Sequence, residues 1–171
     1  MQKDESKLKE EIHSTLVNRS GQTLAVVYQD IDAIAEIGGR EVSGVHAYCF
    51  LGDKLIIVYA EEKKYWTPPG GGVEPSETVE EAVVREVLEE TNMRVLKQKL
   101  IGFQDISEPH RIATQTRSVC IVEPIGEFVS DPDGDITEIK LIDPSDIKRY
   151  FDWGEIGEHI LERALMLKEI F

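Results

Sequence analysis

One segment constrains the fold of this chain more than any other: residues 66–72, with the sequence WTPPGGG. Prolines fix the backbone angle φ and glycines carry no side chain, so this segment excludes a helix and a regular strand. Its backbone can bend sharply and can come close to a ligand. We therefore expect residues 66–72 to form an irregular loop beside a functional site.

The segment that follows, residues 79–91, predicts a helix. Thr78 and Glu81 have the spacing of a capping box, which begins helices. Asn92 tolerates the left-handed conformation that commonly ends them. At roughly 100° per residue, the apolar side chains fill about half of the helical wheel. These apolar residues are Val79, Val83, Val84, Val87 and Leu88.

Three carboxylates lie together at the border of that apolar half. Glu86, Glu89 and Glu90 have i, i+3 and i+4 spacing, so their side chains converge on one patch. Two carboxylates about 4 Å apart repel by about 4 kcal/mol at an effective dielectric constant of about 20. A proton or a divalent cation would relieve this repulsion, and oxygen ligands suit Mg²⁺ or Mn²⁺. For the triplet alone, a solvated acidic helix face is the competing interpretation.

The remaining segments predict one mixed α/β domain with an N-terminal helical extension. We expect helices over residues 6–18, where the apolar stripe is narrow, and over residues 153–171. A further short helix is expected to open at Asp143. Expected strands cover residues 24–28, 45–50, 54–60, 95–104, 112–122 and 136–142. Residues 1–40 would form the extension and residues 41–171 the main domain.

Composition narrows the class of protein. The chain has 19 basic and 33 acidic residues and a formal charge of −14, which disfavours nucleic acid polymers as partners. The charged start predicts no signal peptide, and no apolar run is long enough for a membrane span. The two cysteines, Cys49 and Cys120, lack metal-ligand spacing and are expected to be buried free thiols. Together these features favour a cytoplasmic protein without a membrane partner.

The glycine run and the helix together resemble the Nudix box, which reads G-x5-E-x7-R-E-U-x-E-E-x-G-U with U apolar. Gly71, Glu77 and the segment 85–93 meet every specified position except the late glycine, which is Asn92 here. The resemblance implies the family's α/β/α sandwich with a mixed sheet. It also implies hydrolysis of a diphosphate linked to another group, by attack of water on phosphorus.

The resemblance assigns roles within the box. Arg85 and Glu77 match the pair that orients the catalytic carboxylates, and Glu86 or Glu89, or a water on the metal, would take the proton of the nucleophile. The implied cofactor is Mg²⁺, with Mn²⁺ as the alternative. Its implied ligands are Glu86, Glu89, Glu90 and the backbone carbonyl of Gly71.

Three residues outside the box are candidates for substrate binding. Asp135 is chosen by position in an acidic turn, and its rivals are Asp131, Asp133 and Glu138. Arg111 lies in a loop after the box. Trp66 could stack on a base, although packing under the glycine run is the better interpretation of it.

The resulting hypothesis is a metal-dependent hydrolase of a small nucleoside diphosphate derivative, such as a nucleotide sugar, ADP-ribose or a nucleoside triphosphate. The alternative from another class is a nucleotide-sensing or interaction module that keeps the fold without turnover. An isomerase or an RNA-end hydrolase on the same fold is a further rival, and the charge of −14 disfavours the latter. The narrow apolar stripe of the expected N-terminal helix favours a homodimer.

Overall fold

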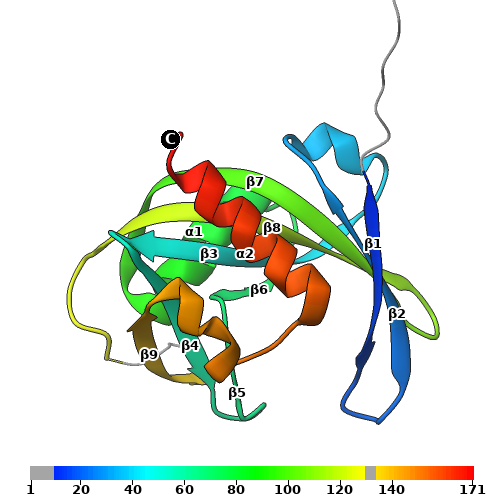
Figure 1. Ribbon diagram of the computed structural model, residues 1–171, viewed down its shortest axis with the longest axis horizontal. Coiled ribbons are helices and arrows are strands. Elements are labelled where there is room, and N and C mark those ends of the chain that lie inside the picture. Colours follow the sequence, from blue (N-terminus) through cyan, green and yellow to red (C-terminus); the bar gives the residue numbers. More distant parts are fainter. Residues whose placement is uncertain (1–9, 130–133) are drawn as a thin grey trace, which may run out of the picture.

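The computed structural model describes residues 10–129 and 134–171, and in these residues nine strands form one mixed sheet (Figure 1). The strands are β1 (Glu11–Val17), β2 (Thr23–Asp30), β3 (Val42–Leu51), β4 (Lys54–Ala60), β5 (Tyr65–Thr67), β6 (Gly70–Gly72), β7 (Met93–Ser107), β8 (Ile112–Pro124) and β9 (Ile136–Ile142). Their order is β1-β2-β7-β8-β3-β4-β5, with β6 paired to β3 and β9 paired to β4. β3 and β8 are parallel, and the other pairs are antiparallel.

Two α-helices cover opposite faces of this sheet: α1 (Val79–Thr91) and α2 (Gly154–Lys168). Successive side chains of a strand point to opposite faces, so β3 contributes to both layers. Val45 and Ala47 pack with α1, whereas Tyr48 and Phe50 pack with Ile160 of α2. Figure 1 shows α2 crossing one face, with α1 behind the sheet. This confirms the expected α/β/α sandwich with a mixed sheet.

The N-terminal helix that the sequence predicts is wrong for residues 11–17, which form strand β1; residues 6–9 lie outside the described part of the chain. Ile12 and Leu16 are four residues apart, a spacing that fits one helix face and also one strand face. In the structure Ile12, Ser14 and Leu16 face inward and their neighbours face water. The basis for expecting a homodimer, a narrow helical stripe, is therefore absent.

The hairpin of β1 and β2 extends the sheet rather than standing apart from it. β2 pairs with β7 from Val26↔Ile106 to Asp30↔Gly102. Leu24, Val26 and Tyr28 of β2 contribute buried side chains to the core under α2. Residues 11–30 thus share a sheet and a core with the rest of the fold.

The expectation of an irregular loop over residues 66–72 is also wrong in part, because β5 and β6 occupy its two ends. Gly71 lies opposite Val45 of β3 and Gly70 lies opposite His46. A β-carbon on Gly70 would collide with the carbonyl oxygen of Val45. Glycines therefore permit a close strand pairing here, where the sequence indicated a bend.

The other expected elements are confirmed, with longer bounds for most strands. The hairpin of β3 and β4 pairs Leu51 with Lys54 across a turn in which Gly52 has a φ of 59°. The short segment after Asp143 is a 3-10 helix, η2 (Pro144–Arg149), and a second one, η1 (Ile34–Ile37), was not expected. Neither α1 nor α2 has the length and apolar character that crossing a bilayer requires.

Candidate active site

Helix α1 presents its acidic residues to the site because both of its ends are fixed by local hydrogen bonds. Thr78 Oγ1 accepts a hydrogen bond from the backbone N–H of Glu81 at the first turn. Asn92 ends the helix in the left-handed conformation, with φ 55° and ψ 37°. Its side chain also donates to the carbonyl oxygen of Glu127 at 2.9 Å. Asparagine thus performs the helix-ending role that glycine has in the family pattern.

The buried face of α1 differs from the face that the sequence indicated, because it consists of Val79, Ala82, Val83, Val87, Glu90 and Thr91. Val83 and Val87 are buried as expected, but Val84 and Leu88 are each 43% exposed. Glu90 instead occupies the buried side and is only 5% exposed. A buried carboxylate needs hydrogen-bond donors, and Glu90 Oε1 accepts from the backbone N–H of Gly70 at 3.0 Å. This contact joins the end of α1 to strand β6.

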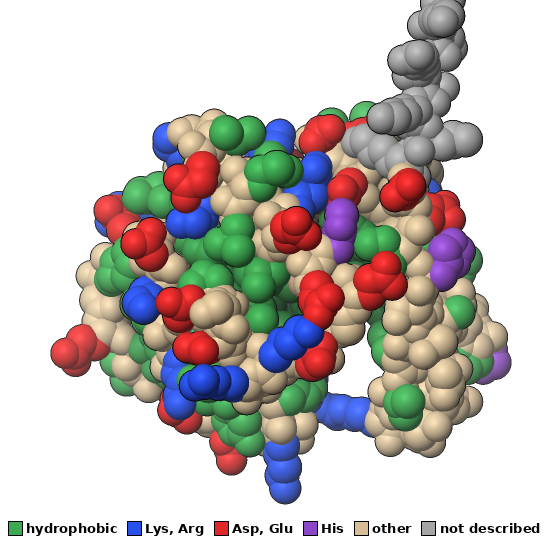
Figure 2. Space-filling view, in the orientation of Figure 1, with side chains coloured by type: hydrophobic (Ala, Val, Ile, Leu, Met, Phe, Trp, Pro, Cys, Tyr) green, Lys and Arg blue, Asp and Glu red, His purple; other side chains and the backbone are tan. Residues whose placement is uncertain are grey.

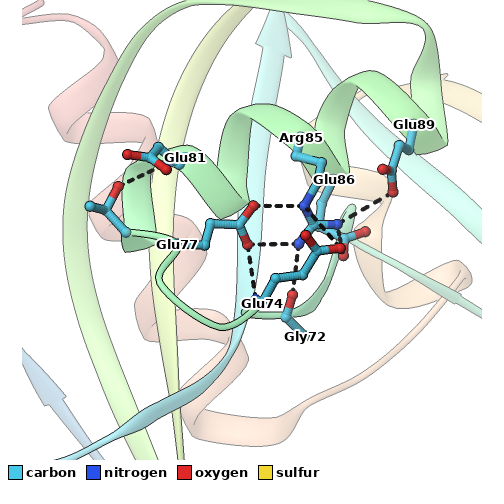
Figure 3. Close-up of polar contacts among 8 residues, drawn as sticks. Gly72, Glu74, Glu77, Glu81, Arg85, Glu86 and Glu89 are labelled. Carbon is cyan, nitrogen blue, oxygen red and sulfur yellow. Dashed lines mark hydrogen bonds and ion pairs between the residues drawn. The ribbon is translucent and has the colours of Figure 1, made fainter.

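Arg85 is the centre of the polar network (Figure 3). Its Nε and Nη2 atoms donate to the two carboxylate oxygens of Glu77 at 2.7 and 2.8 Å. Nη2 also donates to the carbonyl oxygen of Gly72 at 2.9 Å. Nη1 donates to Glu86 Oε1 at 2.9 Å and to Glu89 Oε2 at 3.4 Å. One guanidinium therefore ties the glycine strand, the following turn and two helix carboxylates together.

This network changes the charge equilibria of its members. The hydrogen bonds from Arg85, and then that from the backbone N–H of Glu74, lower the pKa of Glu77 to about 2. The hydrogen bond to Glu77 raises the pKa of Arg85 above its usual range. Both groups are thus ionised at neutral pH, which favours a fixed bidentate pair.

Gly71 is the point where the backbone of β6 comes closest to α1. A β-carbon built on Gly71 would overlap the carboxylate of Glu86, with Oε2 at 2.9 Å and the other carboxylate atoms closer. Glu86 and the backbone at Gly71 are therefore in direct contact. The oxygen atoms of Glu86, Glu89 and the Gly71 backbone are hard donors, which suit a divalent cation such as Mg²⁺. In the described residues, no three His, Cys, Asp or Glu side chains form a preformed metal cage.

A cavity of about 640 Å³ opens on the α2 face of the sheet. Its wall includes Trp66 of β5, Trp153 before α2 and His46 of β3. His46 is the register partner of Gly70, whose N–H donates to Glu90. The β1 segment 14–17 lines the opposite side, and Figure 2 shows an opening between the β1–β2 hairpin and the rest of the molecule. No residue of α1, which lies wholly in the described part of the chain, lines the cavity, and the acidic helix is connected to it through the pairing of Gly70 with His46.

The structure separates the candidates that lie outside the box. Trp66 lines the cavity and also packs against Tyr59 and Tyr150, with ring centroids 5.3 and 5.7 Å away. Arg111 lies at the exposed end of the β7–β8 hairpin, paired with Glu108 at 2.8 Å, and does not line the cavity.

Asp135 precedes β9 and does not line the cavity either. Its carbonyl oxygen accepts from the N–H of Glu61 at 2.9 Å. Among its rivals, Glu138 of β9 lies opposite Tyr59 of β4, while Asp131 and Asp133 fall outside the described residues.

Sequence reasoning missed most of the residues that line the cavity, among them the polar residues His46, Gln104, Gln115 and Arg117. The signal that could have revealed them is the run of five polar residues 114–118 in strand β8, which includes Thr116, Arg117 and Ser118. All three of these residues are buried, although strand interiors with this much polarity normally require a partner or a ligand.

The comparisons with known proteins agree with this fold. The family model described as NUDIX domain matches residues 42–163, so the chain belongs to the NUDIX domain family. The Bacillus subtilis protein YtkD, whose name provisionally assigns 8-oxo-dGTP diphosphatase activity, is 45% identical over 58 residues. That match covers 34% of this chain and 36% of the relative, which is well under two thirds of its length.

Solved structures with low sequence identity share the fold. The pyrophosphohydrolase BsRppH of Bacillus subtilis, in a mutant form, superposes with a TM-score of 0.69 at 20% identity, covering 91% of this chain and 96% of that one. The NUDIX domain of Shewanella oneidensis NrtR, crystallised with ADP ribose, gives a TM-score of 0.59 at 14% identity, with coverages of 78% and 92%.

Proposed function

We propose that this protein is a metal-dependent hydrolase that cleaves the diphosphate linkage of a nucleoside di- or triphosphate derivative. One observation carries the proposal: Arg85 fixes Glu77, Glu86 and Glu89 beside a glycine strand. Gly70 of that strand pairs with His46, which lines a cavity of about 640 Å³. The acidic network would hold the phosphates, and the cavity would hold the rest of the substrate. The names of the relatives, a diphosphatase and a pyrophosphohydrolase, support the same reaction class.

The positions of these residues indicate the role that each would have in the reaction. Glu86, Glu89 and Glu90, with the carbonyl of Gly71, would hold Mg²⁺ or Mn²⁺, which stabilises negative charge on phosphate oxygens and lowers the pKa of water. A carboxylate of Glu86 or Glu89 would accept the proton of the attacking water. Attack on phosphorus breaks one phosphorus–oxygen bond of the diphosphate and releases two phosphorylated products.

Arg85 and Glu77 would act as positioning residues in this reaction. Their bidentate pair holds the turn before α1, and the remaining N–H groups of Arg85 orient Glu86 and Glu89. Fixing charged groups in advance is a large part of catalysis of phosphoryl transfer. Trp66 and Trp153 offer aromatic faces to a base in the adjoining cavity.

The test is product release from a panel of compounds: 8-oxo-dGTP, GTP, ATP, ADP-ribose and a nucleotide sugar, each with Mg²⁺, with Mn²⁺ or with chelator. We expect the protein to cleave at least one of these compounds. This cleavage should require the cation and should be lost in Glu90→Gln. The matched control is Glu81→Gln, which changes an exposed glutamate of the same helix and should cleave normally.

Two outcomes would overturn the proposal. Equal cleavage by Glu90→Gln and by the unaltered protein would remove the acidic site from the reaction. If a folded protein that binds nucleotides cleaved none of the compounds, the nucleotide-sensing module would be favoured.

A further inference from the structure

Arg117 of β8 is a buried guanidinium at the wall of the cavity. It is 2% exposed, and within the described residues no carboxylate forms an ion pair with it. Its Nη1 donates to the carbonyl oxygen of Thr116 at 2.9 Å, and its Nη2 donates to Gln115 Oε1 at 3.3 Å. Nε is buried and has no acceptor. A guanidinium has more N–H donors than these two hydrogen bonds use.

A buried cation without a counter-ion costs free energy, so its retention requires a reason. Burial lowers the pKa of Arg117 to about 10, a value at which the group is still charged at neutral pH. Among the described residues that line the cavity, Asp152 is the one carboxylate, and its Oδ1 accepts from the N–H of Gly154. Arg117 thus puts a positive charge in the wall of this cavity, whereas the chain as a whole has a formal charge of −14.

Gln115, which binds Arg117, adds a further donor to the cavity wall. Gln115 Oε1 accepts from Arg117 and also from Gln104 Nε2 at 3.4 Å. Because its oxygen already serves two donors, the Gln115 side chain has its NH₂ group left to offer. The cavity wall formed by Arg117 and Gln115 is therefore rich in donors, and a ligand that complements it must be rich in acceptors.

The residues that line the cavity favour a flat aromatic ligand. Trp66 and Trp153 both line it, and the guanidinium of Arg117 lies 5.3 Å from the centroid of the Trp153 ring. Aromatic faces and a stacked guanidinium bind planar heterocycles. The planar fork of arginine pairs with two adjacent acceptors on one edge, as guanine presents with O6 and N7. Adenine places an amino donor beside N7, which would face an N–H of Arg117.

We propose that Arg117, oriented by Gln115, is a specificity-determining residue that selects substrates with a guanine-type base. This deepens the proposed function, since the guanine nucleotide would be the substrate of the acidic site described above. The proposal predicts that binding of the base, rather than binding of the phosphates, depends on Arg117.

The test measures binding separately from hydrolysis. Both tryptophans of the chain line the cavity, so their fluorescence reports occupancy directly. Dissociation constants are measured for GDP, ADP and ribose 5-phosphate without metal, and confirmed by calorimetry. The variants are Arg117→Met and Arg117→Lys, with Arg94→Met as the matched control, because Arg94 is exposed and pairs only with Glu123 among the described residues.

We expect the unaltered protein and Arg94→Met to prefer GDP over ADP by about 5-fold to 150-fold, the range that one bidentate base contact supplies. In both Arg117 variants that preference should fall close to one, through weaker binding of GDP. Lysine keeps the charge but not the fork, so it tests the geometry if the methionine variant does not fold. Gln115→Leu, which removes the oxygen that holds Nη2, should reduce the preference as well.

Three results would overturn the assignment of Arg117. The first is an absence of preference for GDP in the unaltered protein, and the second is an unchanged preference in a folded Arg117 variant. The third is an equal loss of affinity for GDP, ADP and ribose 5-phosphate in the Arg117 variants. The last would make Arg117 a phosphate ligand. Failure of the proposed function looks different: the preference for GDP would persist in a protein that hydrolyses nothing.

Discussion

The carboxylate of Glu86 occupies the space that a β-carbon on Gly71 would need. The acidic helix and the glycine strand are therefore packed at the limit that a residue without a side chain allows. Because Arg85 donates both to Glu86 and to the carbonyl of Gly72, the contact is held from both sides. The spacing between glycine and glutamate in the sequence is thus a packing requirement as well as a chemical one.

Gly71→Ala should consequently damage the site. The added methyl group must displace the Glu86 side chain, and a shift of about 1 Å at a catalytic group can reduce the rate by about 100-fold. Because the atoms in the way are the flexible end of the Glu86 side chain, the free energy of unfolding should fall by only about 1 kcal/mol. Gly72→Ala is the matched control, since a β-carbon there meets its nearest atom, the Ser43 carbonyl oxygen, at 3.8 Å. Initial rates and urea unfolding of both variants check this, and equal losses would contradict it.

The sequence predicted α1 because its determinants are local. The cap at Thr78, the stop at Asn92 and the i, i+3, i+4 spacing of the glutamates all operate within one helix. The pair of Arg85 with Glu77 was expected from the resemblance to the Nudix box, and the structure contains it as a bidentate pair. Short-range spacing of this kind can be interpreted without knowledge of the sheet.

The features that the sequence did not predict depend on pairing between distant strands. β1 is a strand because β2 and then β7 supply its partners, and the spacing of Ile12 and Leu16 alone does not decide between helix and strand. β6 is a strand because β3 lies beside it. Arg117 faces the cavity through the register of β8 with β3 and β7, which no local pattern contains.

Arg85→Ala should reduce both stability and activity. Side-chain exposures are 22% for Arg85 and 11% for Glu77, so the lost charged hydrogen bonds should cost about 2–3 kcal/mol of unfolding free energy. Activity should fall by about 100-fold or more, as Glu86 and Glu89 lose their orientation. Arg85→Lys should recover part of the stability but little activity, because an ammonium group cannot bind both oxygens of Glu77.

The control for Arg85 is Arg94→Ala, which removes an exposed pair with Glu123 and should change stability by less than about 1 kcal/mol. Thermal and urea unfolding, combined with initial rates, measure these effects. An Arg85→Lys variant with normal turnover would show that bidentate binding of Glu77 by the guanidinium is not needed.

Cys49 and Cys120 should be inert in the folded protein. They lie opposite each other on β3 and β8, and both are fully buried. A hydrogen bond with Cys120, together with burial, raises the pKa of the Cys49 thiol. Labelling by a thiol reagent should therefore be slower than in urea by about a thousand-fold or more, since it must wait for the core to open. Rapid labelling of either thiol without denaturant would contradict this packing.

Glu77 should make the stability of the protein depend on pH in the acidic range. Its pKa is about 2 in the folded protein, against 4.5 as its ordinary value, because Arg85 and the N–H of Glu74 bind the ionised form. A lowered pKa means that this stabilisation is complete above about pH 4.5 and is lost as the pH falls toward about 2. The difference in melting temperature between the unaltered protein and Glu77→Gln should thus be constant from about pH 7 to about pH 5 and shrink below that. Glu81→Gln, at an exposed position of the same helix, should show no comparable difference at neutral pH. A difference between the protein and Glu77→Gln that grows as the pH falls would refute the pairing with Arg85 as its source.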